Sequence, residues 1–249
     1  LSGRIRQLEQ ELGVPIVARG QRFFGLTPEG ERVLKWTHLI LDNWQSLQQE
    51  LGSIRNKKGD LVGRLVFGVI PSALPMVSQL AKAVQSEHPR VDFSVLSHSS
   101  GEIIRALHDF SIEAGVTYLD NEPIDLAVSK PLYLERYRLF VRDDHPLANR
   151  DSVEWAEAAK YPVSLLTPNM QNRRIIESAF RKAGAQVEPE LESNSIVNLY
   201  THVQMAGLAT VLPEIFIGLM GGTGRVRAIP LIAPVVEHSV GLVAHARDP

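Results

Sequence analysis

Polar side chains gather where apolar, strand-like runs give way to helix-like runs. These positions are Ser72, 97–101 (SHSSG), Thr167, Asn169, Asn194 and Ser195. A helix N-terminus offers unpaired N–H groups and the positive end of the helix dipole, so hydroxyls and amides placed there suit a small anion. Each residue taken alone is equally an ordinary helix N-cap. Both interpretations stay open on the sequence alone.

Basic residues concentrate at the start of the chain. Residues 1–58 hold nine Lys and Arg against six Asp and Glu, a balance of +3, while the whole chain carries −2. A basic segment joined to an acidic body is a mild indication of nucleic-acid contact at one end. A solvated charged surface gives the same count.

Patterns typical of catalysis are missing. The sequence contains no G-x-S-x-G, H-E-x-x-H or Walker A motif, and its eight histidines show no metal-ligand spacing. The absence of cysteine excludes a disulfide, a thiolate zinc site and a cysteine redox sensor in this chain, and is compatible with the cytoplasm. We therefore expect no enzyme activity, no catalytic residues, no metal and no cofactor. We also expect no membrane span, because no apolar run is long enough.

Two helices are predicted in the N-terminal part. Residues 1–12 follow a helical pattern that Gly13 ends, and Thr27 with Pro28 begins a second helix that runs to about Asn56. The second helix carries apolar or β-branched side chains at alternating steps of four and three, which is a heptad seam. They are Val33, Thr37, Ile40, Trp44, Leu47, Leu51 and Ile54. The pattern favours a dimerising linker helix over a long helix packed inside one domain.

The rest of the chain alternates between strands and helices. RLVFGVI, VDFSVL and IEAGVTY are predicted strands separated by helices, which gives a βαβαβ unit of an open α/β sheet. A second α/β unit begins at YRLFVRDDHPLA. Two such units joined by extended crossings leave a cleft at the carboxyl ends of their strands, where small ligands commonly bind.

These features together resemble the LysR-type transcriptional regulators over essentially the whole chain. IRQLEQELGVPIVARGQRFFGLTPEGE is similar to the end of the family's recognition helix, its wing and the start of its linker helix. RLVFGVIPSALP, LERYRLFVRDDHPLA and MAGLATVLPE resemble landmarks of the effector domain in order and spacing. The preceding helices of the DNA-binding motif are expected upstream of residue 1, and the family's C-terminal helix beyond residue 249.

The resemblance implies an α/β fold with four parts. They are 1–26 (the end of a winged helix-turn-helix), 27–58 (the linker helix), 63–134 with 236–249 (effector subdomain I) and 135–235 (effector subdomain II). The two subdomains are Rossmann-like and similar to periplasmic binding proteins. The implied DNA-binding residues are Ser2, Arg4, Arg6, Arg19, Gln21 and Arg22. The implied effector-binding residues are Ser72, His98, Ser99, Ser100, Thr117, Thr167, Asn169 and Ile196.

The implied partners are promoter DNA, a small-molecule effector and further copies of the chain. Members of the family often bind carboxylates, although this sequence shows no obvious pocket arginine. A homodimer through the linker helix and a homotetramer are expected, and contact with RNA polymerase is left open. A solute-binding protein of a transport system is the alternative, but the basic wing and the heptad helix have no place in it. An enzyme on the same fold is a third interpretation, and it lacks a catalytic constellation.

Overall fold

The N-terminal part is a helix followed by a hairpin. The computed structural model describes residues 2–19, 23–55, 61–120, 127–220 and 225–245. Helix α1 (Ser2–Leu12) ends at Gly13, whose φ of +71° is the left-handed C-cap conformation that glycine adopts without strain. Strands β1 (Val17–Arg19) and β2 (Phe23–Leu26) pair antiparallel. The Glu9 carboxylate accepts hydrogen bonds from the backbone N–H groups of Ile16 (2.9 Å) and Val17 (3.1 Å), which ties the hairpin to α1.

Helix α2 (Pro28–Arg55) begins as the sequence predicts. The Thr27 hydroxyl accepts the N–H of Gly30 at 2.9 Å and donates to the carbonyl of Pro15 at 2.6 Å. A Cβ at Gly30 would collide with the carbonyl oxygen of Ile16, so the first turn of α2 packs directly on the chain that leads into the hairpin. The hairpin and the start of the long helix are therefore in close contact.

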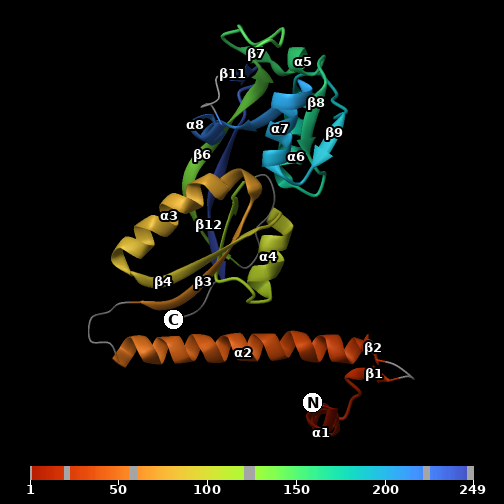
Figure 1. Ribbon diagram of the computed structural model, residues 1–249, viewed down its shortest axis with the longest axis vertical. Helices are drawn as coiled ribbons and strands as arrows, with labels where there is room; N and C mark the ends of the chain where they lie inside the picture. Colours follow the sequence, from red (N-terminus) through yellow and green to blue (C-terminus); the bar gives the residue numbers. More distant parts are fainter. Residues whose placement is uncertain (1, 20–22, 56–60, 121–126, 221–224, 246–249) are drawn as a thin grey trace.

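The predicted seam of α2 is open to solvent in the single chain. Ile40, Trp44 and Leu47 are 65%, 56% and 43% exposed. Figure 1 shows α2 lying across the base of the α/β body and outside it. These exposures are incompatible with a helix buried inside one domain. Within the described residues, no helix combines the length and hydropathy that a membrane crossing needs.

The first α/β unit has the predicted βαβαβ order. Strands β3 (Val62–Val69), β4 (Arg90–Ser97) and β5 (Ala114–Tyr118) are parallel, in the order β4-β3-β5. The short 3-10 helix η1 (Pro71–Ala73) leads into α3 (Leu74–Glu87), and α4 (Ser100–His108) connects β4 to β5. A Cβ at Gly115 would collide with the side chain of Ile103, so α4 approaches the sheet closely there.

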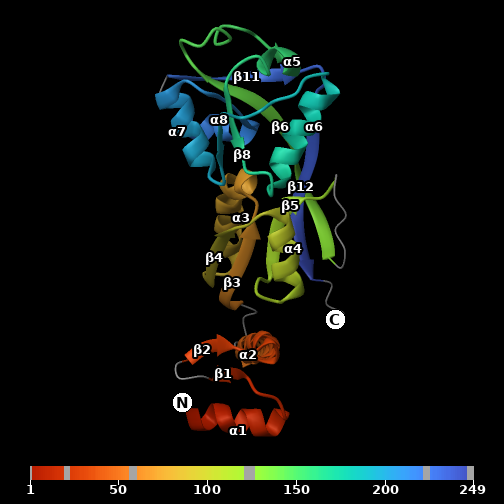
Figure 2. The same cartoon turned by 90° about the vertical axis from the view of Figure 1, so that its right-hand side faces the viewer.

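Two long strands join this unit to the second one. Strand β6 (Ala127–Arg142) pairs with β12 (Glu237–His245) up to Arg136, and from Tyr137 onward it pairs with β10 (Ala209–Pro213). Figures 1 and 2 show β6 and β12 running from the lower unit into the upper one. The sequence places the start of the second unit at YRLFVRDDHPLA, but its first six residues (137–142) are the end of a continuous strand that begins in the first unit. The two units therefore share one sheet path, β4-β3-β5-β12-β6-β10-β8-β9.

The second unit places helices and short strands around β6 and β10. In chain order these are β7 (Val153–Glu154), α5 (Trp155–Ala158), β8 (Val163–Leu166), α6 (Gln171–Lys182), β9 (Leu191–Ser193), α7 (Ile196–Ala206), β10, η2 (Glu214–Phe216), α8 (Ile217–Met220) and β11 (Val226–Ile232). Within residues 186–193 (QVEPELES), only Leu191–Ser193 forms a strand, which pairs with β8. Pro189 has no N–H to contribute to a ladder.

Buried apolar residues of both units form one continuous core. The larger cluster includes Val69 and Ile103 of the first unit and Leu165 and Phe180 of the second. A smaller cluster, which includes Leu199 and Leu212, lies under α7. The predicted α/β fold class is confirmed, and the connection between the units is part of the core.

Candidate functional site

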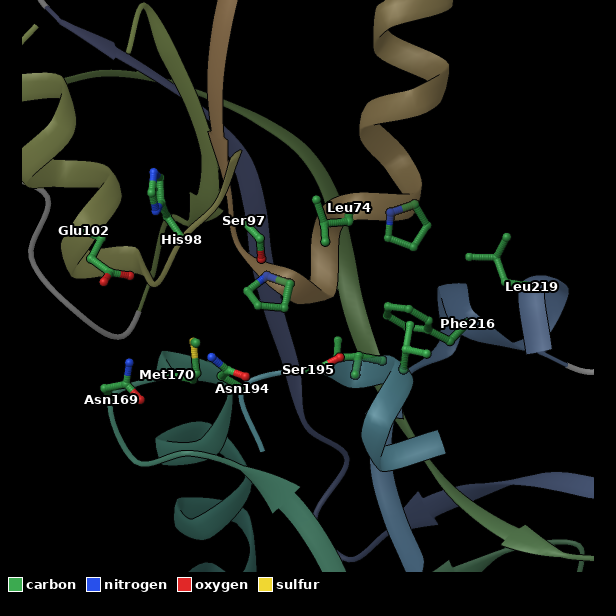
Figure 3. A pocket seen from close by; sticks show the side chains of 14 residues that line it. Leu74, Ser97, His98, Glu102, Asn169, Met170, Asn194, Ser195, Phe216 and Leu219 are labelled. Atoms are coloured by element: carbon green, nitrogen blue, oxygen red, sulfur yellow. The ribbon is translucent and has the colours of Figure 1, made fainter. Parts of the chain in front are cut away.

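A cleft of about 750 Å³ lies between the two α/β units. Its walls come from the starts of α3, α4, α6 and α7 and from η2 with α8, as Figure 3 shows. The lining residues are Pro71, Leu74, Pro75, Ser97, His98, Glu102, Asn169, Met170, Asn194, Ser195, Ile196, Val197, Phe216 and Leu219. The volume is that of a pocket for a small molecule.

The two ends of the cleft differ in chemistry. In Figure 3, His98, Glu102 and Asn169 lie at one end, whereas Phe216 and Leu219 lie at the other. Within the described part of the chain, the side chains of His98, Asn169 and Asn194 make no hydrogen bond to protein. At the apolar end, Leu219 is 64% exposed and Val197 on α7 is 69% exposed. The cleft therefore offers unsatisfied polar groups on one side and uncovered apolar surface on the other.

Glu102 and Ser99 form a capping box at the start of α4. The Ser99 hydroxyl accepts the N–H of Glu102 at 3.3 Å, and the Glu102 carboxylate accepts the N–H of Ser99 at 2.7 Å. The same carboxylate accepts the Ser99 hydroxyl at 2.7 Å. These hydrogen bonds, assisted by the nearby His98 and Arg105, lower the pKa of Glu102 below its usual value. Glu102 is therefore an anion at neutral pH.

The structure brings three of the eight predicted effector residues to the cleft lining. They are His98, Asn169 and Ile196. Ser99 serves as the cap of α4. Ser72 is buried and its hydroxyl lies 3.1 Å from that of Tyr118, so this residue faces the junction between the units and does not line the cleft.

The other three predicted residues carry buried hydroxyls without a partner. The Oγ of Ser100 and the Oγ1 atoms of Thr117 and Thr167 have no hydrogen-bond partner in the described structure. The backbone of β5 at Gly115 packs against the side chain of Ile103 on α4. Thr117 lies two residues further along β5 and so points to the same face of the sheet, and Ser100 lies one helical turn before Ile103. Ser100 and Thr117 therefore belong to the same corner. Buried polar groups normally find a partner, so these hydroxyls are places for a water or a ligand atom.

A buried polar network lies at the junction of the two units, and sequence reasoning missed it. The Tyr118 hydroxyl donates to Glu135 Oε1 at 2.5 Å and accepts from Asn172 Nδ2 at 3.0 Å. The Tyr137 hydroxyl lies 3.4 Å from it. We call Ser72, Tyr118, Glu135, Tyr137 and Asn172 the junction network. It links η1 and β5 of the first unit to β6 and α6.

Glu135 is the unusual member of the junction network. Its side chain is 2% exposed, and it has no cationic partner among the described residues. Burial raises the pKa of Glu135 to about 7, although the hydroxyls of Tyr118, Tyr137 and Ser72 act in the opposite direction. The sequence shows Glu135 only as one acidic residue among the alternating apolar and basic residues of LERYRL, and its hydrogen-bond partner Tyr118 lies on a different strand.

Of the predicted DNA-binding residues, the described ones lie at the end of the molecule remote from the cleft: Ser2, Arg4, Arg6 and Arg19. Arg4 and Arg6 are exposed on α1 and take part in no ion pair within the described residues. Figure 2 shows α1 and β1 below α2 and β2 beside it, all away from the α/β body. Arg19 belongs to β1 and Ser2 to α1, whereas Gln21 and Arg22 lie outside the described residues. In the part of the chain that the structure describes, no three His, Asp or Glu side chains gather as a metal site.

Comparisons with known proteins agree with this organisation. The family model described as "LysR substrate binding domain" matches residues 58–249. A probable nitrogen assimilation transcriptional activator from Synechocystis sp. is 26% identical over 96% of this chain and 72% of its own length. The DNA-binding transcriptional dual regulator OxyR of Escherichia coli is 24% identical over 100% of this chain and 81% of its own length.

Solved structures show the same fold. Full-length CbnR complexed with its target DNA matches with a TM-score of 0.77 at 16% identity, covering 99% of this chain and 83% of CbnR. A full-length OxyR variant from Pseudomonas aeruginosa matches with a TM-score of 0.74 at 21% identity, covering 98% of this chain and 79% of its own.

The chain belongs to the family of LysR-type transcriptional regulators. Its cleft lies within the matched domain, and the relatives described above are transcription regulators rather than solute-binding proteins of transporters. Unlike a thiol sensor, this chain has no cysteine.

Proposed function

We propose that this protein binds promoter DNA through its N-terminal part and that a small molecule in the cleft controls this binding or the activation that follows. The observation that carries the proposal is the cleft itself. It combines unsatisfied polar groups with exposed apolar side chains, and it lies between two units that β6 and β12 join. A ligand touching both walls favours one relation of the units over others.

On the DNA side, Arg4 and Arg6 suit contacts to phosphates or guanine edges in the major groove. Arg19, Gln21 and Arg22 in or beside the wing suit the DNA backbone or the minor groove. The exposure of Arg4 and Arg6, free of ion pairs within the described residues, leaves both guanidinium groups available. The similarity of the fold to that of CbnR, solved on its target DNA, supports this assignment.

We propose that two copies of the chain form a homodimer through α2 and that the complete assembly is a homotetramer. At 1.5 Å per residue, α2 is about 42 Å long, and its seam is solvent-exposed in the single chain. Replacing both Ile40 and Trp44 by Glu places charges in the seam, which costs about 3 kcal/mol or more if the seam is an interface. We expect sedimentation to show loss of the dimer. His38→Glu, on the opposite face of α2, is the control that keeps it, and a dimer that survives the double change contradicts the seam.

For the effector, we propose that residues 63–134 with 236–249 and residues 135–235 act as two subdomains. His98, Asn169 and Ile196 supply contacts from the lining, and Ser100, Thr117 and Thr167 supply buried hydroxyls behind it. Ser72 and Ser99 act indirectly, through the junction network and the α4 cap. Contact with RNA polymerase on the promoter and a location in the cytoplasm belong to the same proposal.

A mobility shift of promoter DNA by the full-length protein tests the proposal. Counterion release makes affinity fall steeply with salt, by about a hundredfold or more between low and physiological ionic strength. Removing one phosphate contact by Arg4→Gln or Arg6→Gln lowers the salt slope by about 1. Lys182→Gln, on the exposed end of α6, is the matched control. Absence of any shift at low salt, or equal losses in all three variants, contradicts the proposal.

A further inference from the structure

The lining of the cleft contains a fixed negative charge but no fixed positive charge. Among the described residues that line it, Glu102 is the only acidic side chain, His98 is the only one that can become cationic, and no lysine or arginine is present. The capping box holds the Glu102 carboxylate in place through the N–H and hydroxyl of Ser99. A negative charge is therefore fixed at the polar end, with no permanent positive charge in the lining to offset it.

We infer that the cleft, in the effector-binding role proposed above, takes a molecule with an apolar body and a hydrogen-bonding head that carries no negative charge. A hydroxyl, amide or amine head fits this description, and a carboxylate does not. The inference thus departs from the carboxylate that the family resemblance favours.

The apolar body has a matching surface. Leu74 is 37% exposed, Val197 69% and Leu219 64%, and all three line the cleft together with Phe216. Figure 3 shows Phe216 and Leu219 on the side away from Glu102. Covering such side chains with a ligand stabilises the complex by roughly 25 cal/mol per Å² of apolar area.

The head has neutral partners. Asn169 and Asn194 each offer both donors and an acceptor. The Ser195 hydroxyl accepts the N–H of Asn198 at 3.4 Å, so its own proton remains available for donation. An amide or hydroxyl head therefore exchanges its water contacts for equivalent ones. An ammonium gains further from Glu102.

The helix N-termini around the cleft favour anions, and this contribution has to be compared with the cost of removing a carboxylate from water. A helix start contributes about 0.3–1 kcal/mol towards a nearby negative charge. Removing a carboxylate from water without a cationic partner costs several kcal/mol. The starts of α4 and α7 are in addition already occupied by the Ser99 and Ser195 caps. The desolvation cost exceeds the dipole contribution, so a carboxylate head is disfavoured.

Three probes of equal chain length test the inference on the full-length protein by titration calorimetry. They are hexanamide, hexylamine and hexanoate. We expect hexanamide and hexylamine to bind more tightly than hexanoate. Glu102→Gln removes the charge but keeps the capping box, because glutamine serves at that position as well. In this variant hexanoate should gain about threefold or more in affinity, hexylamine should lose a similar factor, and hexanamide should stay unchanged.

A change of charge outside the cleft serves as the control. Glu87→Gln, at the exposed end of α3 outside the cleft, should leave the order of the three probes unchanged. Hexanoate binding as tightly as hexanamide, no binding of any probe, or a Glu102→Gln variant with the wild-type order each overturns the inference. If that variant does not fold, the order in the wild-type protein decides alone. Failure of the proposed function is recognised separately, by the absence of a salt-dependent DNA shift.

Discussion

The cleft and the junction network lie between the same two units, yet they differ in whether their polar side chains have hydrogen-bond partners in the protein. In the cleft, His98, Asn169 and Asn194 make no hydrogen bond to protein within the described residues. In the network, the Tyr118 hydroxyl alone has Glu135, Asn172 and Ser72 within hydrogen-bond distance. Groups without partners are available to a ligand, whereas buried groups that share several hydrogen bonds fix the geometry of the elements that carry them. The junction network therefore fixes the two units relative to each other, whereas the cleft has polar groups available for a ligand.

The largest expected effect is on the junction. Tyr118→Phe removes the hydroxyl that Asn172, Ser72 and Glu135 share, and leaves three buried polar groups short of a partner. We expect the free energy of unfolding to fall by about 4 kcal/mol, measured by urea titration. Tyr133→Phe is the control, since that hydroxyl is only half-buried and lies 3.5 Å from Glu135. Equal effects of the two changes would contradict a special role for Tyr118.

A second effect concerns the pH dependence of stability. Burial raises the pKa of Glu135 from an ordinary 4.5 to about 7. The folded protein then binds this proton more tightly than the unfolded chain, so the stabilisation is fully present below pH 4.5 and is lost as pH rises through 7. The loss amounts to about 3 kcal/mol. Glu135→Gln should flatten this part of the stability curve, and an unchanged curve would show that Glu135 does not titrate there.

The smallest effect on stability, and the most specific to the cleft, concerns hydroxyls. Thr167→Val removes an unpartnered hydroxyl at nearly constant volume, so the free energy of unfolding should change by less than about 0.5 kcal/mol. Affinity for a molecule found by thermal-shift screening should fall about fivefold or more. The matched Thr210→Val removes a hydroxyl that donates to the Ser164 carbonyl at 2.7 Å, and it should weaken folding but not binding.

Local signals predicted much of the fold. The cap at Thr27, the glycine end of α1 and the apolar runs of β3, β4 and β5 depend on residues next to one another, so the sequence shows them directly. The continuity of β6 could not be seen, because its change of partner at Arg136 and Tyr137 depends on β12 and β10, which come much later in the chain.

In the site, as in the fold, features that depend on neighbouring residues were predicted and features that depend on distant residues were not. Polar residues at strand ends were identified, and His98, Asn169 and Ile196 reach the cleft lining. Glu135 was not identified, because nothing adjacent to it marks a buried acid and its partner Tyr118 comes from β5 of the other unit. The charge balance of the cleft depends on Glu102, which the sequence shows only as a common capping residue.

The central claim is that filling the cleft changes how the protein holds promoter DNA. Footprinting of the full-length protein on its promoter, with and without a saturating small molecule that raises its melting temperature, tests this most directly. The account predicts a changed length of protected DNA or a changed bend when the molecule is present. The Thr167→Val variant should need about fivefold more of the molecule to reach the same change. Identical footprints and equal transcription with and without the molecule would contradict it.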